Sequence, residues 1–131
     1  MEDRVEKSQF SKYAQEIDIC FNPAIRSSSL LENVRKSLGK MGEELKASGC
    51  ELIGHVKVFL ENENNGYYFL SLTSFDQSPT HKGEMSETVF RVKMTINAIV
   101  FGVEENLLGE MIKRNIEEEI NSVKIKTVGR G

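Results

Sequence analysis

The 131-residue sequence is poor in the residues that mark several common protein classes. It has two cysteines, two prolines and no tryptophan. A disulfide framework needs more cysteines in a shorter secreted chain, so Cys20 and Cys50 are interpreted as buried thiols. No apolar run approaches the roughly 18 residues of a membrane span. The charged start, MEDRVEKSQFSKY, lacks a hydrophobic signal core, which predicts a cytoplasmic protein without a membrane partner.

The motifs of several well-known chemistries are also missing. There is no phosphate loop of the GxxxxGK[ST] type and no GxGxxG after a strand, which argues against nucleotide binding by those routes. HExxH, CxxC and EF-hand patterns are absent too, so no metal site, cofactor or catalytic residue is assigned. The net charge of −3 argues against a dedicated nucleic-acid binder.

The chain has the composition of one ordinary globular domain. Residues 1–12 show no period and predict a flexible N-terminal lead-in, and residues 13–131 predict a single α+β domain. Residues 13–21 alternate in polarity as a strand does, and Pro23 with the serines that follow it should end that strand.

A first helix follows, with a capping box of Ser29 and Glu32 at its start and a left-handed Gly49 at its end. Gly42 lies on its apolar stripe and predicts a close approach of the helix backbone to the sheet. That stripe consists of Leu30, Leu31, Val34, Leu38, Met41 and Leu45.

A β-hairpin is predicted from residues 52–61 and 67–75, which also alternate in polarity. Matching the inner residues pairs Val58 with Leu72 and gives a three-residue turn with Gly66 at positive φ. The predicted inner residues of the first strand are Leu52, Gly54, Val56, Val58 and Leu60.

The rest of the chain predicts a loop at 76–86, a strand at 87–103 and a helix at 104–121. Residues 122–128 alternate weakly and allow a final edge strand. In the strand at 87–103 the side chains predicted to face the core are those of Phe90, Val92, Met94, Ile96 and Ala98. The helix should bury Leu107, Leu108, Met111, Ile112, Ile116 and Ile120.

The predicted fold is a two-layer α+β sandwich, with a mostly antiparallel sheet of four to five strands and two helices on one face. The other sheet face then carries no helix. Aromatic rings beside basic groups there suggest a contact surface, unless the N-terminal segment covers it. Its candidate binding residues are His55, Lys57, Phe59, Tyr67, Phe69, Ser71, Thr73, Arg91, Lys93, Thr95 and Asn97, with His81 and Lys82 in the loop beside it.

Three stretches resemble the C-terminal portion of archaeal CobW-type GTPases, a family related to the metallochaperones. They are GEELKASGCELIGHVKVFLE, GYYFLSLTSFD and FRVKMTINAIVFGVEE, within residues 42–105, about half of the chain. The family's nucleotide-binding and cysteine metal motifs are absent here, so no functional residue is carried over. The resemblance implies a stand-alone accessory domain that contacts a protein client or another subunit in metal or cobalamin metabolism.

The leading hypothesis is a non-enzymatic protein- or ligand-binding domain that uses the open sheet face and the 76–86 loop, with a protein or a second copy of the chain as its partner. One alternative is a small enzyme or ligand binder with a pocket between this face and the 76–86 loop, using His55, His81, Lys57 or Arg91. Another is an RNA-binding sheet in which aromatic rings stack on bases and basic side chains meet phosphates.

Overall fold

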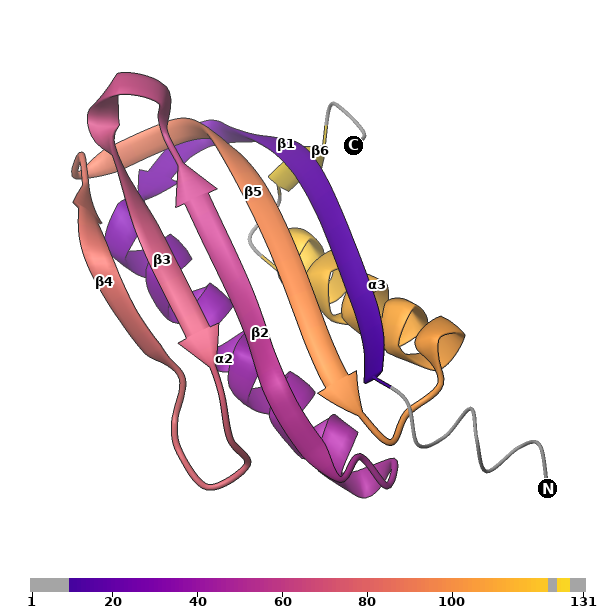
Figure 1. Ribbon diagram of the computed structural model, residues 1–131. Coiled ribbons are helices and arrows are strands. Elements are labelled where there is room, and N and C mark those ends of the chain that lie inside the picture. Colours follow the sequence, from indigo (N-terminus) through magenta and orange to yellow (C-terminus); the bar gives the residue numbers. More distant parts are fainter. Residues whose placement is uncertain (1–9, 123–124, 128–131) are drawn as a thin grey trace, which may run out of the picture.

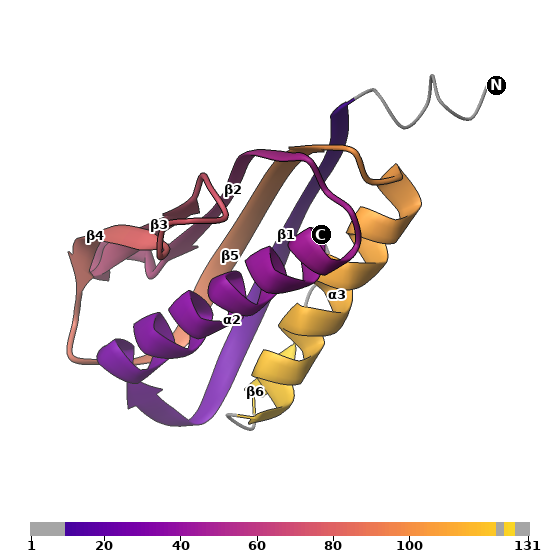
Figure 2. The same cartoon turned by 90° about the horizontal axis from the view of Figure 1, so that it is seen from below.

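The computed structural model describes residues 10–122 and 125–127. They form one six-stranded sheet in the order β4-β3-β2-β5-β1-β6, and both helices lie on one side of it (Figures 1 and 2). The predicted two-layer α+β fold is therefore confirmed. The elements are β1 (Phe10–Arg26), α2 (Ser27–Ala47), β2 (Leu52–Glu61), the 3₁₀ turn η1 (Glu63–Asn65), β3 (Gly66–Leu72), β4 (Thr80–Met85), β5 (Thr88–Phe101), α3 (Glu105–Ser122) and β6 (Ile125–Thr127).

Strand β1 is longer at both ends than the sequence predicted. It begins at Phe10, so residues 10–12 belong to the sheet, while residues 1–9 of the predicted lead-in lie outside the described residues. It also continues past Pro23, and its register against β5 shifts between Cys20 and Ile25. Between these residues β1 advances by five positions and β5 by two, so β1 passes an irregular segment and then pairs with β5 again.

The central strand of the sheet is β5, which pairs antiparallel with both β1 and β2. Strands β1 and β2 therefore run parallel, and the connection between them passes through α2 on the covered face. Figures 1 and 2 show that this crossover is right-handed, as expected for a twisted sheet. Strand β6 pairs with the outer edge of β1, as the weak alternation at 122–128 allowed.

Helix α2 confirms the predicted stripe and corrects its start. The helix begins at Ser27 and its N-cap, Arg26, makes no side-chain capping bond, so the predicted capping box is wrong. At the other end the N–H of Cys50 bonds the carbonyl of Leu45, and Gly49 has φ +92°, which is a Schellman ending. A Cβ added to Gly42 would lie 3.1 Å from Leu72, so the predicted close approach is confirmed.

The hairpin of β2 and β3 has the predicted faces but a different register. Val58 pairs with Leu70, not with Leu72, because η1 lengthens the turn. A shift of two residues keeps every side chain on its face, since strand side chains alternate with a period of two. Gly66 has the predicted positive φ, at +107°, but as the first residue of β3.

The largest correction is β4, which lies in the segment predicted as a loop and pairs with β3. Three predicted inner residues of the strands are also exposed: Leu52, at 53%, Phe90, at 66%, and Gly54. The register shift of β2 between Ile53 and His55 turns Ile53 inward in place of Leu52. The first turn of α3 leaves Leu107 exposed, and the side chain of Ile120 lies outside the described residues.

The core lies between the covered sheet face and the two helices. Alternate residues of the four longest strands meet the apolar stripes of α2 and α3, and most are under 5% exposed. The helices are joined by the buried Asn115, whose amide donates to Glu44 at 2.9 Å, and by a 2.7 Å ion pair of Lys40 with Glu118. The fully buried side chains include Ile19, Leu38, Leu45, Val56, Val58, Leu60, Leu70, Val92, Ile96, Val100, Leu108 and Ile112.

Replacement of Gly66 by alanine should lower the free energy of unfolding by more than about 1 kcal/mol. An added Cβ would lie 2.1 Å from the carbonyl oxygen of Glu84, and the positive φ would be strained as well. Gly39→Ala is the matched control, because nothing lies within 4 Å of its Cβ position and alanine favours a helix by about 1 kcal/mol. Urea denaturation should separate the two variants, and equal midpoints would contradict the described β3–β4 pairing.

Candidate functional site

The sheet face opposite the helices is the candidate site. Helices α2 and α3 both pack on the other face, and no described element covers this one (Figure 2). The register aligns its side chains in rows across the strands. One row holds Glu16, Thr95, Phe59, Phe69 and Lys82, in that order from β1 to β4.

Three aromatic rings gather near the β2–β3 turn. The ring of Phe59 lies 5.4 Å from that of Tyr67 and 6.4 Å from that of Phe69, measured between centroids. The ammonium group of Lys82 lies 5.6 Å from the centre of the Phe69 ring, within cation–π range. Tyr67 remains 41% exposed. We call Phe59, Tyr67 and Phe69 the aromatic cluster.

The basic residues of β5 lie among carboxylates. Arg91 and Lys93 line a surface depression of about 500 Å³ together with Asp18, Glu61 and other polar residues at the β2–β3 turn. The ammonium group of Lys93 also lies 3.7 Å from a carboxylate oxygen of Glu16. The charges at this end of the face therefore largely balance.

A second depression, of about 370 Å³, surrounds His55. Lys12, Lys57 and Asn97 lie along it, and its lining contains no carboxylate. Partial burial, and then the nearby Lys57, lower the pKa of His55 from its usual value of 6.5. His55 is therefore mainly neutral at pH 7.

Most of the predicted site residues do lie together on the open face. Thr73 follows the end of β3 and lies outside the strand. The prediction that His81 and Lys82 lie in a loop is wrong, because both belong to β4. Lys82 pairs with Phe69 on the open face, whereas His81 pairs with the buried Leu70 and so lies on the helix side.

Several exposed residues of this face escaped the sequence prediction. Phe10 is 52% exposed and its ring packs 5.1 Å from that of Phe101. Lys12 pairs with Ile99, and Leu52 with Phe101. The extra strand residues at 10–12 and the β2 bulge place them there. The alternation of FSK with the following strand was the one available signal for residues 10–12.

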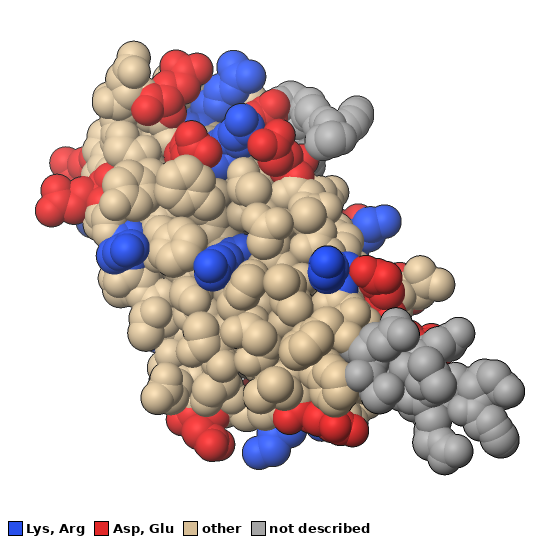
Figure 3. All heavy atoms as spheres, viewed as in Figure 1, with Lys and Arg blue, Asp and Glu red and all other residues tan. Residues whose placement is uncertain are grey.

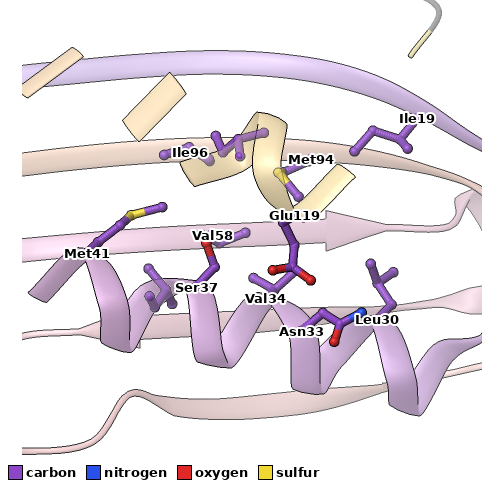
Figure 4. Close-up of a pocket in the computed structure, with 12 residues that line it drawn as sticks. Ile19, Leu30, Asn33, Val34, Ser37, Met41, Val58, Met94, Ile96 and Glu119 are labelled. Carbon is purple, nitrogen blue, oxygen red and sulfur yellow. The ribbon is translucent and has the colours of Figure 1, made fainter. Parts of the chain in front are cut away.

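A different pocket lies between the helices and the covered sheet face (Figure 4). Its walls are the core side chains, among them Ile19, Val34 and Met94, and its volume of about 20 Å³ suits about one water molecule. Glu119 points toward α2 at its side (Figure 4). The pocket is too small to hold a substrate.

Neither a metal centre nor a membrane span is found in the described part of the chain. No group of three or more His, Cys, Asp or Glu side chains there could hold a metal ion. No helix among residues 10–122 is long and apolar enough to cross a membrane. Burial raises the pKa of the Cys50 thiol, which makes it a poor nucleophile near neutral pH.

Comparison with known proteins assigns no family. No family model matches the chain, no curated protein is similar to it, and no solved structure matches its fold. The geometry of the open face is therefore the basis for any functional conclusion.

The pKa of His55 should be below 6.5 in an NMR titration of its ring protons. Lys57→Ala should raise that pKa only part of the way, because burial is the larger cause. The unfolded state takes up the proton first as the pH falls, so this group lowers the free energy of unfolding below about pH 6.5. A pKa above 6.5 in the folded protein would contradict the described environment.

Proposed function

We propose that this protein is a non-catalytic binding domain whose open sheet face contacts a protein partner. The observation that carries the proposal is the aromatic cluster, three rings on a face that no described element covers. Contiguous exposed apolar surface with a polar surround is typical of interaction sites. Aromatic residues are also enriched among those that dominate binding energy.

The surroundings of the aromatic cluster also fit a protein contact. Lys82 holds its charge over one ring, and Tyr67 has a hydroxyl that can donate to a partner. Fully burying a large apolar side chain contributes roughly 1.5–3 kcal/mol. A partner that covers the aromatic cluster would recover part of that free energy.

The two alternative functions have less support from the geometry. His55 and His81 lie on opposite faces of the sheet, so they cannot share one catalytic pocket. The loop before β4 instead forms a groove with α2, on the helix side, through Phe75, Asp76 and their neighbours. An RNA backbone would meet the carboxylates around Arg91 and Lys93, and these would repel its phosphates.

The resemblance to CobW-type accessory domains agrees with this proposal. An accessory domain that lacks the GTPase domain would act by binding another protein. On this basis we propose a partner in metal or cobalamin metabolism, and the aromatic cluster as the place where it binds.

Affinity capture with cross-linking from the native host tests the proposal. Phe69→Ser should leave a folded protein with near-native circular dichroism but lose the captured partner, because it removes one ring of the aromatic cluster. Lys113→Ser, on the exposed side of α3, is the matched control and should retain the partner. Capture of the same proteins by wild type and Phe69→Ser would contradict the proposal.

Val58→Ser checks the assignment of the two faces. Val58 is 1% exposed, so its replacement should lower the free energy of unfolding by more than about 2 kcal/mol. If Phe69→Ser unfolds the protein and Val58→Ser does not, the open face is in fact the core.

A further inference from the structure

Strand β4 is the outermost strand at one end of the sheet, and no described strand pairs with its far edge. Figure 1 shows β4 at the left border of the molecule, with no described element beyond it. The other end of the sheet is partly occupied. There β6 pairs with Ile19 to Phe21 of β1, and the N–H of Lys12 donates to a carboxylate oxygen of Glu105 at 3.0 Å. The β4 edge is therefore the part of the described sheet best placed to accept another strand.

The hydrogen bonds to β3 determine which backbone groups of β4 face this edge. The N–H of Ser86 donates to the carbonyl of Asn65 at 2.9 Å, directly beside the first pair of the β3–β4 ladder. Bonded and non-bonded pairs alternate along an antiparallel ladder. The even-numbered residues of β4 therefore bond to β3, and the N–H and C=O groups of His81, Gly83 and Met85 face the open edge.

Two glycines support this assignment. An added Cβ on Gly66 would meet the carbonyl oxygen of Glu84, and one on Gly83 would meet the carbonyl oxygen of Tyr67. Tyr67 pairs with Glu84, so both carbonyl oxygens of this pair point toward the opposite strand, as they do in a bonded pair. The neighbouring position, Gly83, is then non-bonded toward β3 and has its polar backbone groups on the outer side.

The side chains of β4 carry both signs of charge on the open sheet face. Lys82 pairs with Phe69 and Glu84 with Tyr67, so both charged side chains lie on the face away from the helices. Both are exposed, and Gly83 lies midway between them. Figure 3 shows basic and acidic groups close together at the left border of the molecule, where Figure 1 places β4.

We propose that β4 of a second copy of this chain pairs antiparallel with β4, about a twofold axis that passes beside Gly83 and perpendicular to the sheet. Gly83 then exchanges hydrogen bonds with the same residue of the second copy, and His81 does so with Met85, about six bonds in all. Lys82 of each copy lies opposite Glu84 of the other. The contact is isologous and closed, and it is separate from the binding of a partner at the aromatic cluster.

Charge and hydrogen bonding select this register over its neighbours. An axis at Lys82 would place the two lysines opposite each other, and an axis at Glu84 would do the same with the two carboxylates; like charges directly opposite destabilise a ladder. An axis between two residues would set the outward backbone groups of each copy against residues that already bond to β3. Only the axis at Gly83 matches every pair, so the polar residues that oppose pairing with an unrelated strand favour a second copy.

The contact is short, so the dimer is reversible. Strand β4 has six residues, and the pairing covers less area than a standard protein interface. Backbone hydrogen bonds and two exposed charge pairs hold it together, and salt screens such pairs. We therefore expect association at high protein concentration that weakens as the ionic strength rises.

Charge exchange tests the register. Lys82→Glu and Glu84→Lys each place like charges opposite each other, so each variant alone should dimerise roughly tenfold or more weakly than wild type in sedimentation equilibrium at low salt. An equal mixture of the two variants should form a heterodimer, and the double variant should recover the wild-type affinity, because both restore opposite charges. Both positions are exposed, so circular dichroism should stay near-native.

A proline at the open edge tests the hydrogen bonds. His81→Pro removes an N–H that faces away from β3, so the monomer should keep its fold while the dimer is lost. Lys82→Pro is the matched comparison, because it removes an N–H that bonds to β3 and should lower the melting temperature of the monomer. In wild type, the amide hydrogen of Gly83 should exchange with solvent more slowly in concentrated than in dilute protein.

Two further variants separate this dimer from other contacts. Lys113→Glu, on the exposed side of α3, and Phe69→Ser, in the aromatic cluster, should each leave the dimer unchanged, so loss of a partner at the aromatic cluster is distinguishable from loss of the dimer. A wild type that stays monomeric at millimolar concentration would overturn the proposal. So would single charge variants that dimerise as wild type does, a mixture that does not associate, or a His81→Pro variant that still dimerises. Loss of the dimer in Phe69→Ser would place the contact on the open face instead.

Discussion

Two helices cover the sheet from one side only, and this one-sided packing determines where every other feature of the molecule can lie. The strands send alternate side chains to opposite faces, so one set must be apolar enough to meet α2 and α3. Val56, Val58 and Leu60 on β2 do so, each at 1% exposed or less. The intervening residues of the same strand are then free of the core, and their chemistry is available for contact.

The irregular positions of the sheet shape the open face as much as its regular alternation does. The bulge of β2 turns Leu52 outward, and a Cβ on the adjacent Gly54 would lie 2.9 Å from the carbonyl oxygen of Ile99. A β-bulge changes the direction of side chains locally while the rest of the ladder is kept. This is how an apolar residue comes to lie beside His55 and Phe101 at one end of an otherwise polar face. The face thus has two chemically distinct halves.

The sequence predicted the fold, and which residues lie on the open face, better than it predicted strand register and strand ends. Period-two and period-3.6 patterns are physical requirements of burial, so the strands, both helices and the faces of Phe59 and Phe69 followed from them. Register did not follow, because pairing Val58 with Leu70 or with Leu72 satisfies the same alternation. Strand β4, THKGEM, was missed because an edge strand is polar and its Gly83 breaks the pattern, features that also limit unwanted edge pairing. The position of Leu52 depended on a bulge that no local pattern specified. Those of Phe10 and Lys12 depended on an extension of β1 whose one signal was the alternation of residues 10–12.

The central claim is that the outer face is open to solvent in the monomer and is not covered by another part of the chain. NMR relaxation by a soluble paramagnetic probe, on dilute monomeric protein, measures this directly. The account predicts strong broadening for the methyl groups of Leu52 and the ring of Tyr67, and little for the methyl groups of Val58. Protection of Leu52 and Tyr67 comparable to that of Val58 in the monomer would contradict it.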